Sequence, residues 1–195
     1  PHQHITTGQL PPGRKIAAMA APGTKASIGY AGFGTWYDEH RTRVLDPALS
    51  VAMAALLAAL DDALSDRDRT RIRRISGRVK SKRRAWRKLK RLLREGAITT
   101  VDDVPTAIRD LVGLRITCTN LRDIEMVQAA LDALPLPGSS VMGLCFDPGS
   151  ERDYVIEPKE SGYRGWHVNL EVGIEVEGKA APVTIELQVR TLLQD

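Results

Sequence analysis

Residues 184–191 read Thr-Ile-Glu-Leu-Gln-Val-Arg-Thr, and they alternate apolar and polar side chains in the two-residue period of a β-strand. Successive side chains of a strand point to opposite faces, so the alternation predicts one face on a core and a polar face opposite it. The apolar residues are Ile185, Leu187 and Val189, and the polar ones are Glu186, Gln188 and Arg190. A strand buried only for packing would not carry this polar set, so we expect the polar face to have a function.

A second stretch, residues 154–167, precedes this strand and reads Tyr-Val-Ile-Glu-Pro-Lys-Glu-Ser-Gly-Tyr-Arg-Gly-Trp-His. Pro158 and Gly162 predict a turn within it. The side chains gathered around that turn are those of Lys159, Tyr163, Arg164 and His167. Cations, an aromatic ring and an imidazole in one place suit a phosphorylated ligand that carries a base.

The rest of the chain predicts helices before and between strands. Apolar residues at three- and four-residue steps predict an amphipathic helix over 36–64, divided in two where Asp46 and Pro47 would cap the second part. Further helices are predicted at 81–94, from Val104-Pro105 through Leu111, and at 123–134. Strands are predicted at 114–119, 141–146, 166–172 and 183–190. This order favours an α+β domain with one mixed sheet and helices packed against it.

The length and composition predict one domain with an N-terminal arm. Residues 1–34 are rich in Pro, Gly, Ala and Thr and lack helical or strand period, which is typical of a flexible arm. Residues 35–195 are long enough to bury one core, and 43% of the 195 residues are hydrophobic.

Positive charge is concentrated in residues 67–94, which hold fifteen Lys and Arg and only one acid, Asp68. This block therefore carries +14, against −10 for the rest of a chain whose net charge is +4. Such a block attracts nucleoside polyphosphates, tRNA or ribosomal RNA, because Lys and Arg displace the counterions of phosphate chains. An ordinary solvated helix face is the alternative.

The two cysteines, Cys118 and Cys145, have neither metal-ligand nor redox spacing, which fits a reducing cytoplasm. No apolar stretch approaches the roughly 18 residues that suggest a membrane span, so we expect no membrane partner.

Two upstream elements complete a series: Arg78-Val-Lys80 and Arg109-Asp-Leu-Val-Gly-Leu-Arg115. Together with residues 154–167 and 184–191, in this order, they closely resemble the synthetase domain of the RelA/SpoT family, which makes the alarmones pppGpp and ppGpp. The resemblance runs from about Arg41 to the end of the chain. It implies a nucleotidyltransferase-like fold, and further helices beyond residue 195, where synthetases of this family usually continue.

The resemblance also implies a reaction. The family transfers the β,γ-pyrophosphate of ATP to the 3′-hydroxyl of GDP or GTP and releases AMP. Asp110 and Glu186 match the two acids that hold Mg²⁺, and Glu186 matches the residue favoured to activate the attacking hydroxyl. For Asp110, the structural alternative is an ion pair with Arg109 or Arg115; for Glu186, it is a cross-strand salt bridge.

Further residues match the nucleotide contacts of the family. On the ATP side, Arg78 is expected to stack on adenine, and Lys80 and Lys88 to meet phosphate. Arg115 faces the ATP phosphates or bonds Asp110. Many relatives have serine where this chain has Arg84. The acceptor-side residues are Tyr163 for stacking on guanine, Lys159, Arg164 and His167 for the phosphates, Gln188 and Arg190 for the floor, and Asp195 for guanine or ribose.

Two other functions remain open. Some small relatives are toxins that pyrophosphorylate the 3′ end of tRNA, and the 67–94 block would then hold RNA and an antitoxin would be a partner. A catalytically inactive regulator that binds nucleotides or RNA is the other, although a pure binder has little use for two metal-holding acids. The sequence contains no His-Asp dyad of the alarmone hydrolase type. A homo-oligomer is a further expectation.

Overall fold

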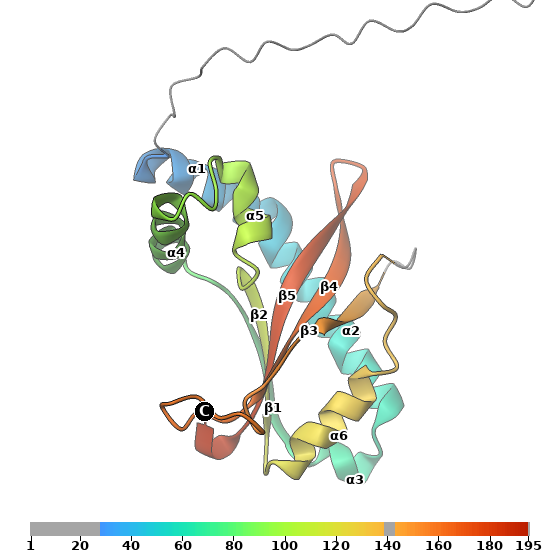
Figure 1. The fold of residues 1–195 in the computed structure, drawn as a ribbon. Coiled ribbons are helices and arrows are strands. Elements are labelled where there is room, and N and C mark those ends of the chain that lie inside the picture. The colour runs from blue at the N-terminus through green and yellow to red at the C-terminus, as the bar shows by residue number, and fades with distance from the viewer. Residues whose placement is uncertain (1–27, 139–142, 195) are drawn as a thin grey trace, which may run out of the picture.

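The computed structural model describes residues 28–138 and 143–194, which form a five-stranded mixed sheet with helices around it (Figure 1). The strands are β1 (Ile72–Val79), β2 (Val112–Cys118), β3 (Leu144–Asp153), β4 (Trp166–Val176) and β5 (Lys179–Thr191). Their order across the sheet is β1-β2-β5-β4-β3. The β2–β5 pair is parallel and the other three pairs are antiparallel, which confirms the predicted α+β class.

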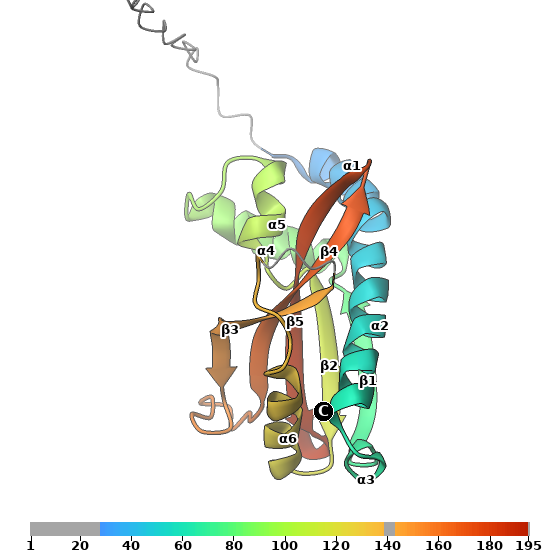
Figure 2. The ribbon, with the colours of Figure 1, turned by 90° about the vertical axis from the view of Figure 1, so that its right-hand side faces the viewer.

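The helices differ in length and place. They are α1 (Tyr30–His40), α2 (Asp46–Ala63), α3 (Asp66–Arg69), α4 (Lys82–Arg94), α5 (Val104–Ala107) and α6 (Arg122–Leu131), with a π-helical turn at Arg41–Leu45 and 3-10 turns at Val101–Asp103 and Leu192–Gln194. Helices α2 and α6 lie along the sheet, whereas α1, α4 and α5 gather at one end of it (Figure 2).

One face of the sheet packs against α2. At Gly77 on β1 a Cβ atom would lie 2.5 Å from a methyl carbon of Leu49 on α2, so a larger residue there would force the Leu49 side chain to move. Gly77 pairs with Leu114 of β2, and Leu114 pairs with Leu187 of β5, so these three residues share the covered face. The predicted apolar set of β5 therefore faces the core, where Leu187 is fully buried.

The N-terminal helical run differs from the prediction in two ways. It does not divide at Asp46, because the π-helical turn carries α1 continuously into α2. It also begins at Tyr30 and buries Phe33, so the boundary predicted at residue 34 lies inside α1. Residues 1–27 of the predicted arm lie outside the described residues.

Three further boundaries are corrected. Strand β1 was not predicted, because Arg73, Arg74 and Arg78 on this edge strand obscure the alternation. The helix predicted through Leu111 ends at Ala107, and the chain turns there into β2. The strand predicted at 141–146 begins at Leu144 and continues to Asp153, and residues 141–142 lie outside the described part.

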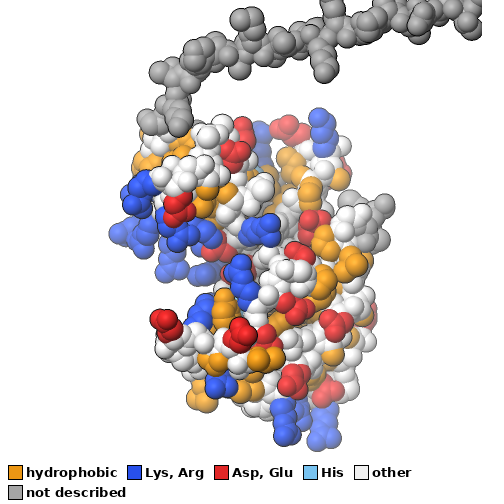
Figure 3. Space-filling model, in the orientation of Figure 1, with side chains coloured by type: hydrophobic (Ala, Val, Ile, Leu, Met, Phe, Trp, Pro, Cys, Tyr) orange, Lys and Arg blue, Asp and Glu red, His pale blue; other side chains and the backbone are white. Residues whose placement is uncertain are grey.

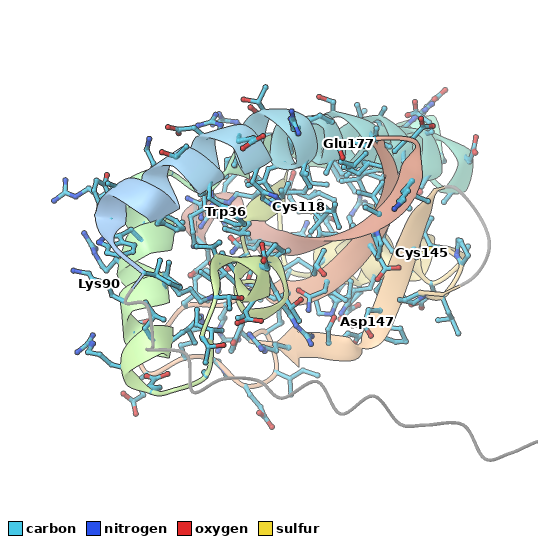
Figure 4. The ribbon with its side chains drawn as sticks, turned by 90° about the horizontal axis from the view of Figure 1, so that it is seen from above. Trp36, Lys90, Cys118, Cys145, Asp147 and Glu177 are labelled. Carbon is cyan, nitrogen blue, oxygen red and sulfur yellow. The ribbon has the colours of Figure 1, made fainter. Side chains whose placement is uncertain are left out.

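By length and composition alone, the run Tyr30–Ala63 could cross a membrane, contrary to the expectation that no such stretch occurs. Core helices of soluble proteins pass the same test, and α2 buries Ala52 and Leu56 against the sheet. The run is also held by the β4–β5 turn, where Glu177 accepts a hydrogen bond from Arg43 at 2.8 Å (Figure 4).

Candidate functional site

The opposite face of the sheet is polar and floors a cleft. Glu186 of β5 pairs with Gly113 of β2, which pairs with Arg78 of β1, so these residues share the face turned away from α2. The space-filling view is hollowed beside this face, and Lys and Arg side chains gather over α4 along its upper edge (Figure 3).

Asp110 and Glu186 meet in this cleft, although 76 positions separate them in the sequence. Both line a cavity of about 220 Å³ together with Lys88. Both also line a second, adjoining cavity with Arg78 and Arg115. These cavities thus bring together the two acids and three of the four cations predicted for the ATP side, and the fourth cation, Lys80, bonds Asp110.

Two lysines neutralise Asp110, which lies just before β2. Lys88 Nζ on α4 donates to Oδ1 at 2.8 Å, and Lys80 Nζ, from the junction of β1 and α4, donates to Oδ2. Burial raises the pKa of Asp110, but the hydrogen bonds and charges of the two lysines outweigh it and hold the pKa below its ordinary value. Asp110 is therefore ionised at neutral pH. Both lysines lie where the predicted phosphate oxygens would bind.

Glu186 lies between the side chains of Gln188 and His167. Gln188 Nε2 donates to its Oε2 at 2.8 Å, and His167 Nδ1 lies 3.6 Å from its Oε1. Burial and the negative charge of Asp110 raise the pKa of Glu186, while His167 and Gln188 lower it further than these raise it. The charge of Asp110 thus acts on Glu186, in keeping with the cavities that the two carboxylates share.

His167 is held within the site, because both of its ring nitrogens face protein groups and the residue is only 8% exposed. Nε2 lies 2.9 Å from the Tyr163 hydroxyl, and Nδ1 faces Glu186. In this structure His167 therefore links the predicted guanine-stacking ring to the predicted base, and its contact with the acceptor phosphates stays a prediction.

Tyr154 belongs to the same cluster, although the sequence did not single it out. Its ring lies 5.1 Å from His167 and 6.1 Å from Tyr163, both edge to face. Lys159 Nζ lies 4.2 Å from the centre of the Tyr154 ring and 5.1 Å from that of Tyr163. Gly165 leaves room for this packing, since a Cβ there would lie 2.8 Å from the Tyr163 hydroxyl.

The polar residues of β5 and β2 complete the floor. Arg115 donates to Gln188 Oε1 at 3.4 Å. Burial raises the pKa of Tyr163, while the positive charges of Arg190 and Arg115 oppose that shift, so both guanidinium groups lie near the ring. Gln188 and Arg190, the two predicted floor residues, and Arg115, predicted for the ATP side, thus lie beside the predicted acceptor side.

Two predicted residues do not join the cleft. Arg164 lines a different cavity with Arg71 and Thr191, and its backbone N–H donates to Gln194 at 3.2 Å. Asp195 lies outside the described residues.

Three polar residues that the sequence did not predict also line the cavity of Asp110 and Glu186: Arg109, Arg152 and Asn169. For Asn169 the signal was the strand alternation, because it lies two positions after His167 and pairs directly with Glu186.

A model of the region found in RelA and SpoT proteins matches residues 77–195, more than half of the chain. The chain belongs to the RelA/SpoT family. This confirms the resemblance drawn from the four sequence elements. The charged groups of the cleft come from three of these elements, at 78–80, 109–115 and 184–191, and from Lys88.

Two similar curated proteins come from Bacillus subtilis strain 168. The GTP pyrophosphokinase YjbM is 34% identical over 85 residues, which are 44% of this chain and 36% of YjbM. The GTP pyrophosphokinase YwaC is 28% identical over 106 residues, 54% of this chain and 46% of YwaC. The chain spans between a third and a half of the length of these relatives.

Solved structures share the fold. Small alarmone synthetase 1 from Bacillus subtilis, bound to its product pppGpp, superposes with a TM-score of 0.64 at 24% identity, over 82% of this chain and 74% of that one. A GTP pyrophosphokinase family protein from Streptococcus pneumoniae gives a TM-score of 0.62 at 23% identity, over 82% and 71% of the two chains. The mixed sheet with its helices is thus the fold of small alarmone synthetases.

Proposed function

We propose that this chain is an ATP-dependent pyrophosphokinase that transfers the β,γ-pyrophosphate of ATP to the 3′-hydroxyl of GDP or GTP, which makes (p)ppGpp and releases AMP. The observation that carries the proposal is the meeting of Asp110 and Glu186 in one cavity beneath Lys80, Lys88 and Arg78. Phosphoryl transfer needs little covalent chemistry from the protein, so catalysis rests on placing charges around the phosphates, and this cleft supplies them.

The donor side lies between α4 and β1. Lys80 and Lys88 would exchange Asp110 for oxygens of the triphosphate, because phosphate is the more highly charged partner. Arg78 is exposed on β1 at the edge of the cavity, where its planar guanidinium can stack on adenine. The triphosphate is thereby held with its β-phosphorus towards the two acids.

Magnesium fits the two carboxylates. Among the described residues, no group of three or more His, Cys, Asp or Glu side chains could hold a metal. Mg²⁺ needs only one or two carboxylates when phosphate oxygens and water complete its shell, so Asp110 and Glu186 would hold it. When bound, the ion neutralises phosphate charge and lowers the proton affinity of a neighbouring hydroxyl.

The acceptor side is the tyrosine cluster. Guanine would stack on Tyr163, and Lys159 would turn from the two tyrosine rings to the acceptor's phosphates. Glu186 takes the proton of the 3′-hydroxyl as the oxygen bonds to the β-phosphorus. The bond from that phosphorus to the bridging oxygen of AMP breaks, and AMP leaves with the electron pair.

A transfer assay tests the proposal. The protein is incubated with Mg²⁺ and ATP labelled in the β-phosphate, and separately with GDP, GTP or deacylated tRNA, after which the labelled products are resolved. We expect label on GDP or GTP, AMP in equal amount, and neither with Asp110→Asn. AMP without a labelled nucleotide, or label on tRNA alone, would contradict the proposal.

The same assay distinguishes the two alternative functions, the tRNA-modifying toxin and the inactive regulator. The exposed cations of α4, among them Arg83 and Arg87, give the tRNA acceptor its physical basis. The curated relatives are named for GTP, however, and nothing in them points to tRNA. Absence of any AMP would favour the inactive regulator. A cytoplasmic location, a homo-oligomer and an antitoxin partner stay predictions.

A further inference from the structure

The fold holds the backbone of Lys80 at both its N–H and its carbonyl group. Lys80 lies between the last residue of β1 and the first of α4, and its side chain bonds Asp110. Its backbone N–H donates to the Leu111 carbonyl at 2.7 Å, one residue past Asp110. Strand pairing therefore ties one peptide group of Lys80 to the segment that carries its partner.

The carbonyl of Lys80 is held from another direction. It accepts a hydrogen bond from the hydroxyl of Tyr37 on α1, 43 residues earlier. Tyr37 is 1% exposed, and its ring packs on Phe33 with 5.6 Å between ring centres. Burial raises the pKa of the Tyr37 hydroxyl, so it remains protonated and donates. This bond gives the part-buried Lys80 carbonyl a partner within the protein.

Helix α1 holds the same junction at other points. Asp38, next to Tyr37, accepts from Lys82 Nζ at 2.5 Å. The ring of Phe33 lies 5.3 Å from that of Trp86 on α4. Both amide groups of Lys80 are therefore anchored, and α1 anchors one of them. The direction of the lysine side chain follows from this backbone.

We propose that Tyr37 is a positioning residue for pyrophosphoryl transfer, which holds the Lys80 backbone so that the lysine ammonium stands at the donor phosphates. The inference rests on the proposed function. It also adds to what the family shows, because Tyr37 lies outside residues 77–195, the part that the family model matches.

The test removes one oxygen atom. Tyr37→Phe keeps the buried ring, and we expect kcat to fall about tenfold, the effect of one hydrogen bond, with the KM for the acceptor unchanged. The matched control is Tyr30→Phe, the same change on an exposed ring of the same helix, and it should leave kcat unchanged. An unchanged kcat in Tyr37→Phe, with only a lower melting temperature, would overturn the proposal.

A double-mutant cycle separates positioning from general support. If Tyr37 acts through the lysine amine, Tyr37→Phe should lower the residual kcat of Lys80→Ala by less than twofold. A second tenfold loss in that background would show that Tyr37 acts elsewhere.

Hydrogen exchange gives a readout that needs no activity. We expect the backbone amides of residues 79–83 to exchange faster in Tyr37→Phe than in the wild type, while those of β5 stay unchanged. Equal exchange at 79–83 would overturn the positioning role even if the protein proved to have no transferase activity, whereas an inactive wild type with the expected exchange would refute only the proposed function.

Discussion

The two faces of β5 differ in what fixes their side chains. On one face Leu187 and its apolar neighbours are buried against the layer that includes α2, and any residue of similar size and polarity would fill the space. On the other, Glu186 is held by Gln188 at 2.8 Å and faces His167 at 3.6 Å, and a change of one atom alters its charge or its partners. One strand thus carries a face that packs in the core and a face that lines the candidate site, one residue apart.

The stability of the fold and the proposed activity should therefore depend on different faces of β5. Burial depends on area and volume, which tolerate conservative exchange. The polar face depends on charge and on hydrogen-bond direction, which do not. Substitutions on the two faces should therefore produce opposite signatures.

The largest effect is expected at Glu186. Glu186→Gln keeps the shape and removes the proton acceptor, so kcat should fall at least about 1,000-fold, or about 4 kcal/mol of barrier, in steady-state assays. The melting temperature should change little. Glu171→Gln, on the neighbouring strand β4, is the matched control and should retain activity. Transfer that survives in Glu186→Gln would remove this residue from the role of base.

Leu187→Ala should give the opposite signature. It leaves a hole in the buried face, so the free energy of unfolding in urea should fall by about 3 kcal/mol. The kcat of the protein that remains folded should stay near that of the wild type. Gln188→Ala, on the polar face, should cost less than about 1 kcal/mol of stability. Equal losses in the two variants would show that the faces are not distinct.

A smaller effect is expected from Asp110→Asn, because the change leaves two lysines facing each other. At neutral pH the variant should unfold with about 1 kcal/mol less free energy than the wild type. The folded-state pKa of Asp110 is lowered, so its stabilising contribution is present above the unfolded pKa and is lost as the pH falls through the folded pKa.

The unfolding curves of the two proteins should therefore converge below roughly pH 4, where aspartates become protonated. A constant difference from pH 7 to pH 2, measured by urea titration at each pH, would contradict the pairing of Asp110 with Lys80 and Lys88.

The smallest effect concerns Tyr154. Tyr154→Leu removes one of the two rings that contact Lys159, so the KM for GDP or GTP should rise about threefold while the KM for ATP stays constant. Tyr154→Phe keeps the ring and should behave as the wild type. A rise in the KM for ATP instead would place the ring on the donor side of the cleft.

Much of the fold could be predicted, because buried strands and helices leave a period in the sequence. The alternation in β5 and the basic helix α4 were both confirmed. Strand β1 was not predicted, since an edge strand with arginines on both faces does not alternate regularly between apolar and polar residues. The continuity of α1 and α2 was not predicted either, because Asp46 and Pro47 are as compatible with a helix interior after a π-helical turn as with a new helix start.

The candidate site was predicted in part, and mostly through family resemblance. No period in the sequence shows that Asp110 and Glu186 share a cavity, because that contact depends on the parallel pairing of β2 with β5. The bonds of Asp110 to Lys80 and Lys88 were missed for the same reason, since residues 22 and 30 positions apart meet only after folding. Arg164 looked equivalent to Lys159, but local backbone direction turned it to a different cavity.

The pairing of two lysines with one aspartate has a consequence for which solutes can enter. A pocket lined by ammonium groups with no nearby carboxylate would bind inorganic phosphate or sulfate tightly and remain occupied. Here the Asp110 carboxylate occupies both Lys80 Nζ and Lys88 Nζ, so a small anion must displace it from two nitrogens at once. Under the proposed function, a triphosphate, which offers several oxygens on one scaffold, would displace the carboxylate, so selection for polyphosphates would begin before either base is bound.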